Sequence, residues 1–135
     1  MTISTTIIII VIAVVISVLI SLSGRSAAKG IDKEHFKNEW NDVIQLSKDK
    51  KTQAMSVIHA DKLLDDALKC LRYDGKTMAE RLVAAKQRLK HKDEVWQAHK
   101  LRNKIVHETL HEPTEKEIKL ALKGYYSTFK DLGVL

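Results

Sequence analysis

Apolar side chains dominate the first part of the chain, without a helical or alternating pattern of polar positions. Ile, Val and Leu fill most positions between residues 3 and 22, and the run from Ile7 to Ile16 contains no polar residue. About twenty helical residues extend roughly 30 Å, which is the thickness of the hydrocarbon core of a bilayer. The pattern therefore predicts a transmembrane helix over residues 3–22, in an anchor that comprises residues 1–23.

A cleaved signal peptide is the alternative interpretation of this segment, because residues 21–24 include small side chains at which cleavage could occur. However, no Lys or Arg precedes the apolar run, which is longer than the ~7–15 residues of a typical signal peptide. We therefore expect an uncleaved, single-pass membrane anchor. Arg25, Lys29 and Lys33 follow it, and because basic flanks stay on the cytoplasmic side, the carboxy-terminal domain is predicted to be cytoplasmic.

Beyond a predicted linker over residues 24–31, apolar residues recur every three or four positions, which is the period of an amphipathic helix. Capping residues predict helices that begin at Asp32, Thr77 and Thr114. The apolar spacing predicts two further helices, over residues 52–73 and 93–110. Gly75 is placed to end the first of these two helices. The predicted fold class is all-α: an N-terminal transmembrane helix followed by a four- to five-helix antiparallel bundle over residues 32–135.

The charged residues all lie after the anchor. Residues 1–23 contain none, so the 23 Lys and Arg and the 17 Asp and Glu of the remaining chain account for the whole net charge of +6. A positive excess attracts polyanions, chiefly nucleic acid or anionic lipid headgroups, without deciding between them. Cys70 is the only cysteine, so neither an intrachain disulfide nor a cysteine-based metal cluster can form, and we expect it to pack as a small apolar side chain.

The helix predicted over residues 93–110 carries the residues most suggestive of chemistry. Arg102, Asn103 and His107 are spaced Arg-Asn-x-x-x-His. A fixed cation can hold a phosphate, and a histidine can exchange protons near neutral pH, so the combination suggests acid–base chemistry on a phosphodiester. His99 extends the pattern one turn earlier, and a polar column of His99, Asn103 and His107 would line a cleft or a subunit interface, or would simply face water.

Two carboxylates on the helix predicted over residues 52–73 are candidate supporting residues. Asp61 and Asp65 are four residues apart and share one helix face. They could pair with Arg102 or hold His107 in one tautomer across the bundle. Exposure to solvent, or pairing with neighbouring lysines, is the more ordinary outcome for such carboxylates.

The segment Leu101-Arg102-Asn103-Lys104-Ile105-Val106-His107-Glu108 resembles the signature of the HEPN domains, which are small helical bundles. In that signature an arginine, followed directly by Asn or a similar polar residue, precedes a histidine by a few positions. The helical span from about residue 32 to residue 132 is also similar in size. The resemblance implies a metal-independent endoribonuclease, without a cofactor, that dimerises and places two copies of the motif across a shared cleft.

The resemblance also implies a role for each residue of the motif. His107 would act as general base or acid around the ribose 2′-OH, Arg102 would steady the scissile phosphate, and Asn103 would orient the phosphate or the histidine. Many members of the family are not nucleases and serve as binding or interaction modules. The membrane anchor also departs from the typical family member.

A metal-dependent protease is a different class of enzyme that the same region suggests. The segment His107-Glu108-Thr109-Leu110-His111 satisfies H-E-x-x-H, in which two zinc ligands lie one helical turn apart. Such a protease needs a third ligand, and neither Glu115 nor Glu117 stands in a supporting pattern. Pro113 follows too soon for the motif to lie within a helix. We therefore expect no metal site.

The sequence thus predicts a membrane-anchored HEPN-like domain that cleaves RNA, or binds RNA or a nucleotide. The predicted site consists of Arg102, Asn103 and His107, with His99, Asp61 and Asp65 in support. The expected partners are RNA or a nucleotide, the lipid bilayer at residues 3–22, and a second copy of the chain in a homodimer. The alternative is a non-catalytic, membrane-tethered scaffold that uses the bundle to dimerise or to recruit a partner.

Overall fold

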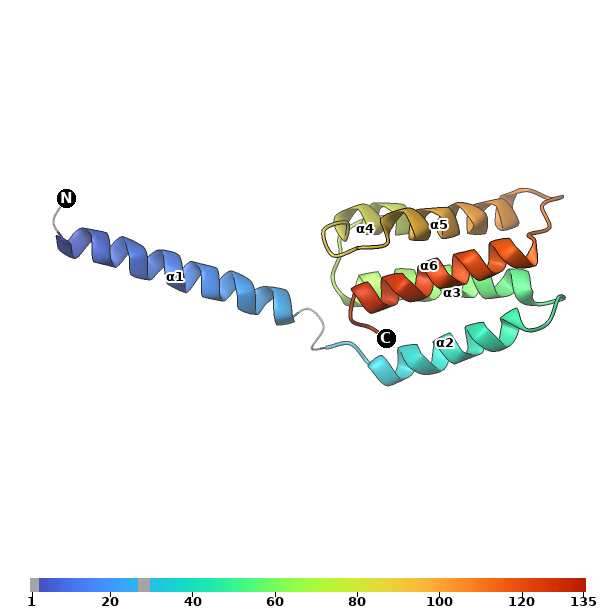
Figure 1. Ribbon diagram of the computed structural model, residues 1–135, viewed down its shortest axis with the longest axis horizontal. Helices are drawn as coiled ribbons and strands as arrows, with labels where there is room; N and C mark the ends of the chain where they lie inside the picture. Colours follow the sequence, from blue (N-terminus) through green and yellow to red (C-terminus); the bar gives the residue numbers. More distant parts are fainter. Residues whose placement is uncertain (1–2, 27–29) are drawn as a thin grey trace. The chain divides into compact units, whose positions relative to one another are not determined.

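The computed structural model describes the backbone of residues 3–26 and 30–135, and the side chains of residues 5–19 and 30–135. The chain divides into two compact units, residues 1–30 and residues 31–135. The described residues form six α-helices and no strand (Figure 1), which confirms the predicted all-α class. Part of the predicted linker, residues 27–29, lies outside the described residues.

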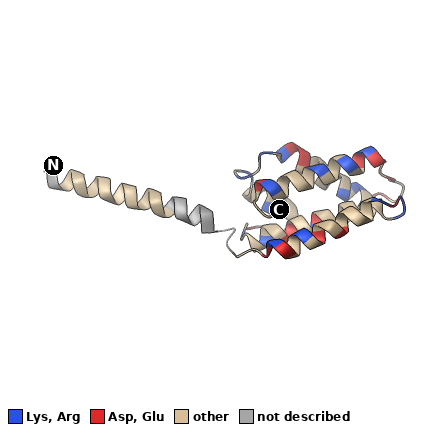
Figure 2. Ribbon diagram, turned by 60° about the horizontal axis from the view of Figure 1, so that its bottom comes forward, with Lys and Arg blue, Asp and Glu red and all other residues tan. Residues whose placement is uncertain are grey.

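The first unit contains one helix, α1 (Ile3–Ser26). Its described side chains, residues 5–19, are all exposed, and none of these side chains is charged (Figure 2). None of the helices among the described residues combines the length and the hydropathy that crossing a membrane requires, so the predicted transmembrane helix over residues 3–22 is not borne out. The side chains of residues 20–24, which include the candidate cleavage site, lie outside the described set.

Five helices form the second unit: α2 (Lys33–Ser47), α3 (Gln53–Cys70), α4 (Met78–Ala84), α5 (Lys92–His107) and α6 (Glu115–Asp131). Figure 1 shows α2 and α5 running in one direction and α3 and α6 in the other, with the short α4 between α3 and α5 along the chain. α3 contacts α2, α4, α5 and α6, so it is the central helix of the unit. The predicted four- to five-helix antiparallel bundle is confirmed.

The helix starts follow the capping residues of the sequence. Asp32 accepts a hydrogen bond from the backbone N–H of His35 at the start of α2. Thr114 and Glu117 form the complete reciprocal capping box at the start of α6. Thr77 caps α4, but the Glu80 carboxylate accepts from the backbone N–H of Lys76 and not from that of Thr77, so the second predicted box is only half formed.

Two predicted helix ends are wrong. α3 ends at Cys70, and Arg72, not Gly75, adopts the left-handed conformation beyond it, with φ 63°. α5 ends at His107, because Glu108 is already extended with φ −102° and ψ 107°. Cys70 is exposed, so the expectation that it packs in the core is also wrong.

The hydrophobic core lies between the five helices of the second unit, and α4 contributes Leu82 to it. Its most completely buried large side chains are Val57, Leu64, Leu68, Leu82, Val95, Tyr125, Phe129, Leu132 and Val134. α5 and α6 approach very closely at Gly124, where an added Cβ would lie only 2.7 Å from the carbonyl oxygen of Glu94. This contact brings the next residue, Tyr125, into the interior beside α5 and α3.

A carboxylate from the last turn of α6 holds the start of α5. Oδ2 of Asp131 accepts hydrogen bonds from the backbone N–H of Lys90 at 2.8 Å and of His91 at 3.1 Å, and lies 3.0 Å from Nδ1 of His91. Burial raises the pKa of Asp131, but the His91 ring and the two backbone N–H groups outweigh burial and hold the pKa below its ordinary value. α5 and α6 are therefore joined at this end of the bundle.

We expect Asp131→Asn to lower the free energy of unfolding by about 1–3 kcal/mol near neutral pH. Because the folded-state pKa of Asp131 is lowered, its ionised form stabilises the fold above the unfolded-state pKa of ~3.9, and this contribution disappears as the pH falls through the folded-state pKa. Urea unfolding followed by circular dichroism at several pH values measures the difference between the two proteins. A difference that did not shrink in acid would contradict this account.

Candidate functional site

Asp61 on α3 lies at the centre of a polar cluster inside the bundle. Only 4% of the residue is exposed. Its Oδ1 accepts a hydrogen bond from the Tyr125 hydroxyl at 2.9 Å and lies 2.7 Å from Nδ1 of His99, and its Oδ2 lies 3.6 Å from Nε of Arg102. A buried carboxylate is tolerated only when it is paired, and here partners from both α5 and α6 supply the pairing.

Asn103 closes this cluster into a ring. Nη1 of Arg102 donates to Oδ1 of Asn103 at 3.0 Å, and Nδ2 of Asn103 lies 3.4 Å from Nε2 of His99. The contacts therefore run from Asp61 to His99, to Asn103, to Arg102 and back to Asp61. We call these four residues the Asp61 ring. Three of them lie three and four positions apart on α5, which places them on one face of that helix.

The Tyr125 hydroxyl supports the ring from α6. Burial, together with the adjacent Asp61 carboxylate, raises the pKa of Tyr125 well above its ordinary value. The hydroxyl therefore keeps its proton and donates it in the hydrogen bond to Asp61. Tyr125 was not among the sequence-predicted site residues. The available signal was that a tyrosine on an apolar helix face needs a hydrogen-bond partner when it is buried.

His107 lies apart from the ring. It is the last residue of α5 and is exposed, and no side-chain hydrogen bond or ion pair joins it to the residues that the structure describes. The exposure of the side chains therefore increases along the predicted polar column: His99 is nearly buried, Asn103 is half-buried and His107 is exposed. One option from the sequence was that Asp61 or Asp65 orients His107; in the structure Asp61 contacts His99 instead.

Asp65 belongs to a different contact. Its two oxygens accept from Nε and Nη2 of Arg81 at 2.7 and 3.1 Å, and Nζ of Lys69 lies 2.8 Å from Oδ2. Burial raises the pKa of Asp65, but the hydrogen bonds from Arg81 and Lys69 outweigh burial and hold it below its ordinary value. Arg81 also donates to the carbonyl of Gly75. Asp65 thus joins α3 to α4 and makes no contact with Arg102.

The H-E-x-x-H segment does not have the geometry of a zinc site. α5 ends at His107 and Glu108 is extended, so His107 and His111 do not lie on successive turns of one helix. Within the described part of the chain, no group of three or more His, Cys, Asp or Glu side chains is placed to hold a metal ion.

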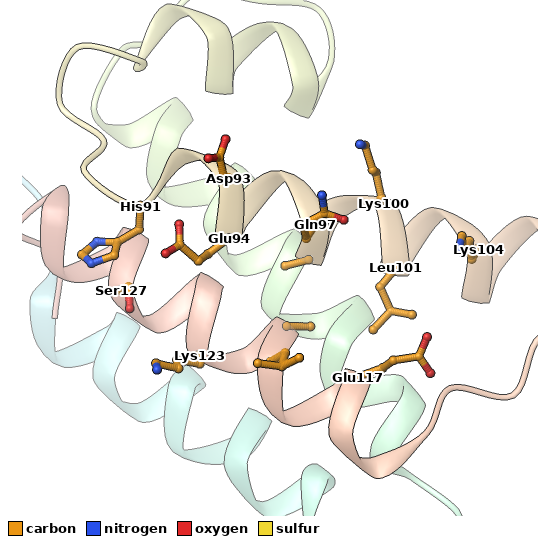
Figure 3. Close-up of a pocket in the computed structure, with 13 residues that line it drawn as sticks. His91, Asp93, Glu94, Gln97, Lys100, Leu101, Lys104, Glu117, Lys123 and Ser127 are labelled. Atoms are coloured by element: carbon orange, nitrogen blue, oxygen red, sulfur yellow. The ribbon is translucent and has the colours of Figure 1, made fainter.

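A groove lies between α5 and α6, and the sequence did not indicate it. The groove has a volume of about 640 Å³ and an apolar floor that includes Ala98, Leu101 and Ala121, and the exposed Leu120 also lines it. Figure 3 shows charged side chains of both signs along its rim, with Glu94 towards the start of α5 and Lys104 towards its end. None of Arg102, Asn103 and His107 lines this groove, so it is separate from the motif.

Comparison of this chain with family models, with curated proteins and with solved structures finds no match. The predicted resemblance to HEPN domains therefore rests on the sequence motif around Arg102 alone. The Asp61 ring and the exposed histidine beyond it are the features from which a function can be argued. Chemically, the ring presents a guanidinium whose side chain is 31% exposed and whose Nη1 donates to Asn103.

Proposed function

We propose that residues 31–135 form a HEPN-like module that binds RNA and cleaves it without a metal ion, using Arg102, Asn103 and His107. The observation that carries this proposal is the state of Arg102. Its side chain is 31% exposed; its buried Nε lies 3.6 Å from the Asp61 carboxylate, within ion-pair but not hydrogen-bond distance, and its Nη1 donates to Asn103. Nη2 remains to donate to a phosphate oxygen, and a guanidinium already held in place loses little conformational entropy when it binds one.

His107 would supply the proton transfers. It lies one helical turn beyond Asn103 on the same side of α5, and its side chain is exposed. In the proposed reaction the ribose 2′-oxygen loses its proton to His107 and attacks the adjacent phosphorus, and the bond to the 5′-oxygen breaks as that oxygen takes up a proton. The products are a 2′,3′-cyclic phosphate and a free 5′-hydroxyl. A homodimer that shares the cleft would provide a second histidine.

The test is an RNA cleavage assay on the full-length protein purified in a mild detergent. We expect a labelled single-stranded RNA to be cut in the presence of excess EDTA, and the products to end in cyclic phosphate. The matched control substrate carries 2′-deoxyribose throughout and should remain intact, because it has no nucleophile. Cleavage that EDTA abolishes, or the absence of any RNA binding, would refute the proposal.

A non-catalytic scaffold is the second candidate function. The specific observation in its favour is that no described side chain orients His107, whereas catalytic histidines usually have an orienting partner. A scaffold of this kind would bind RNA or a protein without cleaving it. RNA binding with full retention of the intact strand in the same assay would select this function.

We also propose that α1 anchors the chain in a membrane with the bundle on the cytoplasmic side. The support is the lack of charge over residues 1–23, the exposure of apolar side chains such as Ile8 and Val15 along the described part of α1, and the basic flank that begins at Arg25.

Alkaline carbonate extraction of cell membranes should leave the full-length protein in the pellet. For the orientation, Ser26→Cys is made in a Cys70→Ser background, since Cys70 is exposed and would react. A membrane-impermeant maleimide should then label the protein only after the cells are permeabilised. Release by carbonate would exclude the anchor, and labelling of intact cells would reverse the orientation.

A further inference from the structure

The two ring nitrogens of His99 have partners of different chemistry. Nδ1 lies 2.7 Å from Oδ1 of Asp61, a carboxylate that also pairs with the Arg102 guanidinium. A carboxylate can only accept, so Nδ1 carries the proton in this contact. In the neutral imidazole Nε2 is then bare and can only accept a hydrogen bond. Its neighbour is Nδ2 of Asn103 at 3.4 Å, which donates to it.

This assignment determines the orientation of the Asn103 amide. With Nδ2 turned towards His99, Oδ1 faces the other way and accepts from Nη1 of Arg102 at 3.0 Å. A reversed amide would place an NH₂ group against the guanidinium and an oxygen against the bare Nε2, which sets donor against donor and acceptor against acceptor. Both contacts therefore favour one orientation. If His99 carried its proton on Nε2, the contact with Arg102 would still favour this orientation, but the contact with His99 would set donor against donor and oppose it.

We propose that His99 is a positioning residue: its Nδ1–H tautomer, selected by buried Asp61, orients the Asn103 amide and thereby holds the Arg102 guanidinium in place. Asp61 from α3 contacts His99 directly, and Arg102 from α5 and the Tyr125 hydroxyl from α6 are the other charged or titratable groups that contact Asp61. The assignment of the tautomer and of the amide orientation is independent of any ligand. Only its consequence for phosphate binding rests on the proposed function.

The tautomer is tested in the unmodified protein. Two-bond ¹⁵N–¹H correlation spectra of the full-length protein in detergent distinguish a protonated Nδ1 from a protonated Nε2 in a neutral histidine. We expect neutral His99 to show the Nδ1–H pattern. An Nε2–H pattern would overturn the proposal, because Nε2 could then no longer accept from Asn103.

Two substitutions separate the two contacts of His99. In His99→Asn the side-chain amide occupies roughly the place of Nδ1 and can still donate to Asp61, but nothing remains at the place of Nε2. In His99→Gln the amide reaches roughly the place of Nε2 and can still accept from Asn103, while the contact with Asp61 is weakened. If His99 only satisfies the Asp61 carboxylate, the Asn variant should bind RNA more tightly than the Gln variant. If His99 positions the Asn103 amide, the Gln variant should bind RNA more tightly than the Asn variant.

The readouts are the side-chain amide resonances of Asn103 and the affinity for a labelled RNA oligonucleotide, measured by fluorescence anisotropy. We expect His99→Asn to shift and broaden the Asn103 amide signals and to weaken RNA binding about tenfold, the size of effect expected for the loss of one hydrogen bond. His99→Gln should keep the signals close to their original positions and bind RNA within about threefold of the wild type. Unchanged Asn103 signals and unchanged affinity in His99→Asn would overturn the proposal.

These measurements also separate this proposal from the proposed function. If the wild-type protein binds no RNA, the proposed function fails, and the tautomer of His99 and the Asn103 signals still decide whether His99 orients the amide. If RNA binds but both variants bind it as the wild type does, the proposed function stands and the positioning role is refuted.

Discussion

Asp61→Ala is expected to lower the free energy of unfolding by about 3–5 kcal/mol, the range found when one member of a buried ion pair is removed. The substitution leaves the Tyr125 hydroxyl without its acceptor, frees Nδ1 of His99 and removes the only described anionic partner of Arg102. Each of these polar groups would then be buried or half-buried without compensation. Chemical denaturation of the full-length protein, followed by circular dichroism, measures the loss.

Asp66→Ala is the matched control, because Asp66 lies on the same helix and its ion pairs are with the exposed residues Lys62 and Lys69. Its removal should change stability by no more than about 0.5 kcal/mol. Tyr125→Phe removes only one of the hydrogen bonds to Asp61 and should cost about 1 kcal/mol. If Asp61→Ala proved as mild as the control, the Asp61 ring would not be a stabilising element of the bundle.

His107→Ala is expected to reduce the rate of metal-independent RNA cleavage by about 10²–10⁴-fold, which is the usual contribution of general acid–base catalysis. The fold should be unaffected, because His107 is exposed and its side chain has no partner among the described residues. Arg102→Lys should be milder, since lysine keeps the charge and loses the planar, multi-point contact with phosphate. Single-turnover cleavage rates, with circular dichroism as a check on folding, measure both variants.

His111→Ala is the control for the metal-dependent alternative, because His111 belongs to the H-E-x-x-H segment but not to the Arg-Asn-x-x-x-His motif. It should leave the cleavage rate close to that of the wild type. Equal losses in His107→Ala and His111→Ala, together with activity that requires added zinc, would contradict the proposed metal-independent chemistry. The zinc interpretation would then have to be taken up again.

The helices of the bundle could be predicted from the sequence because the signals are local. The three- and four-residue spacing of apolar side chains marks the face that a helix buries, and residues such as Asp32 and Thr114 satisfy free N–H groups within their own first turn. Helix ends were less predictable. Arg72 takes the left-handed conformation that Gly75 was expected to adopt, and the backbone leaves the helix after His107 although apolar residues continue the pattern to Leu110.

The candidate site was predicted in its residues but not in its contacts. The motif spacing on α5 identified Arg102, Asn103 and His107 and the column that includes His99, because these residues are neighbours on one helix. Which histidine would be oriented by a carboxylate could not be deduced in this way. His99 and Asp61 are separated by 38 residues along the chain, and Tyr125 and Asp61 by 64.

The two aspartates of α3 show where the sequence by itself stops and where the tertiary structure decides. Their four-residue spacing determined that both lie on the same side of the helix, and it made them equivalent candidates. Packing of α3 against α5 and α6 places Asp61 in contact with His99, Arg102 and Tyr125. Packing of α3 against α4 places Asp65 in contact with Arg81. Helical period and capping are properties of a few adjacent residues, so the sequence determined the bundle and its motif. Burial, and the pairing that burial demands, depend on which helices meet, so only the folded chain decided which polar groups form the site.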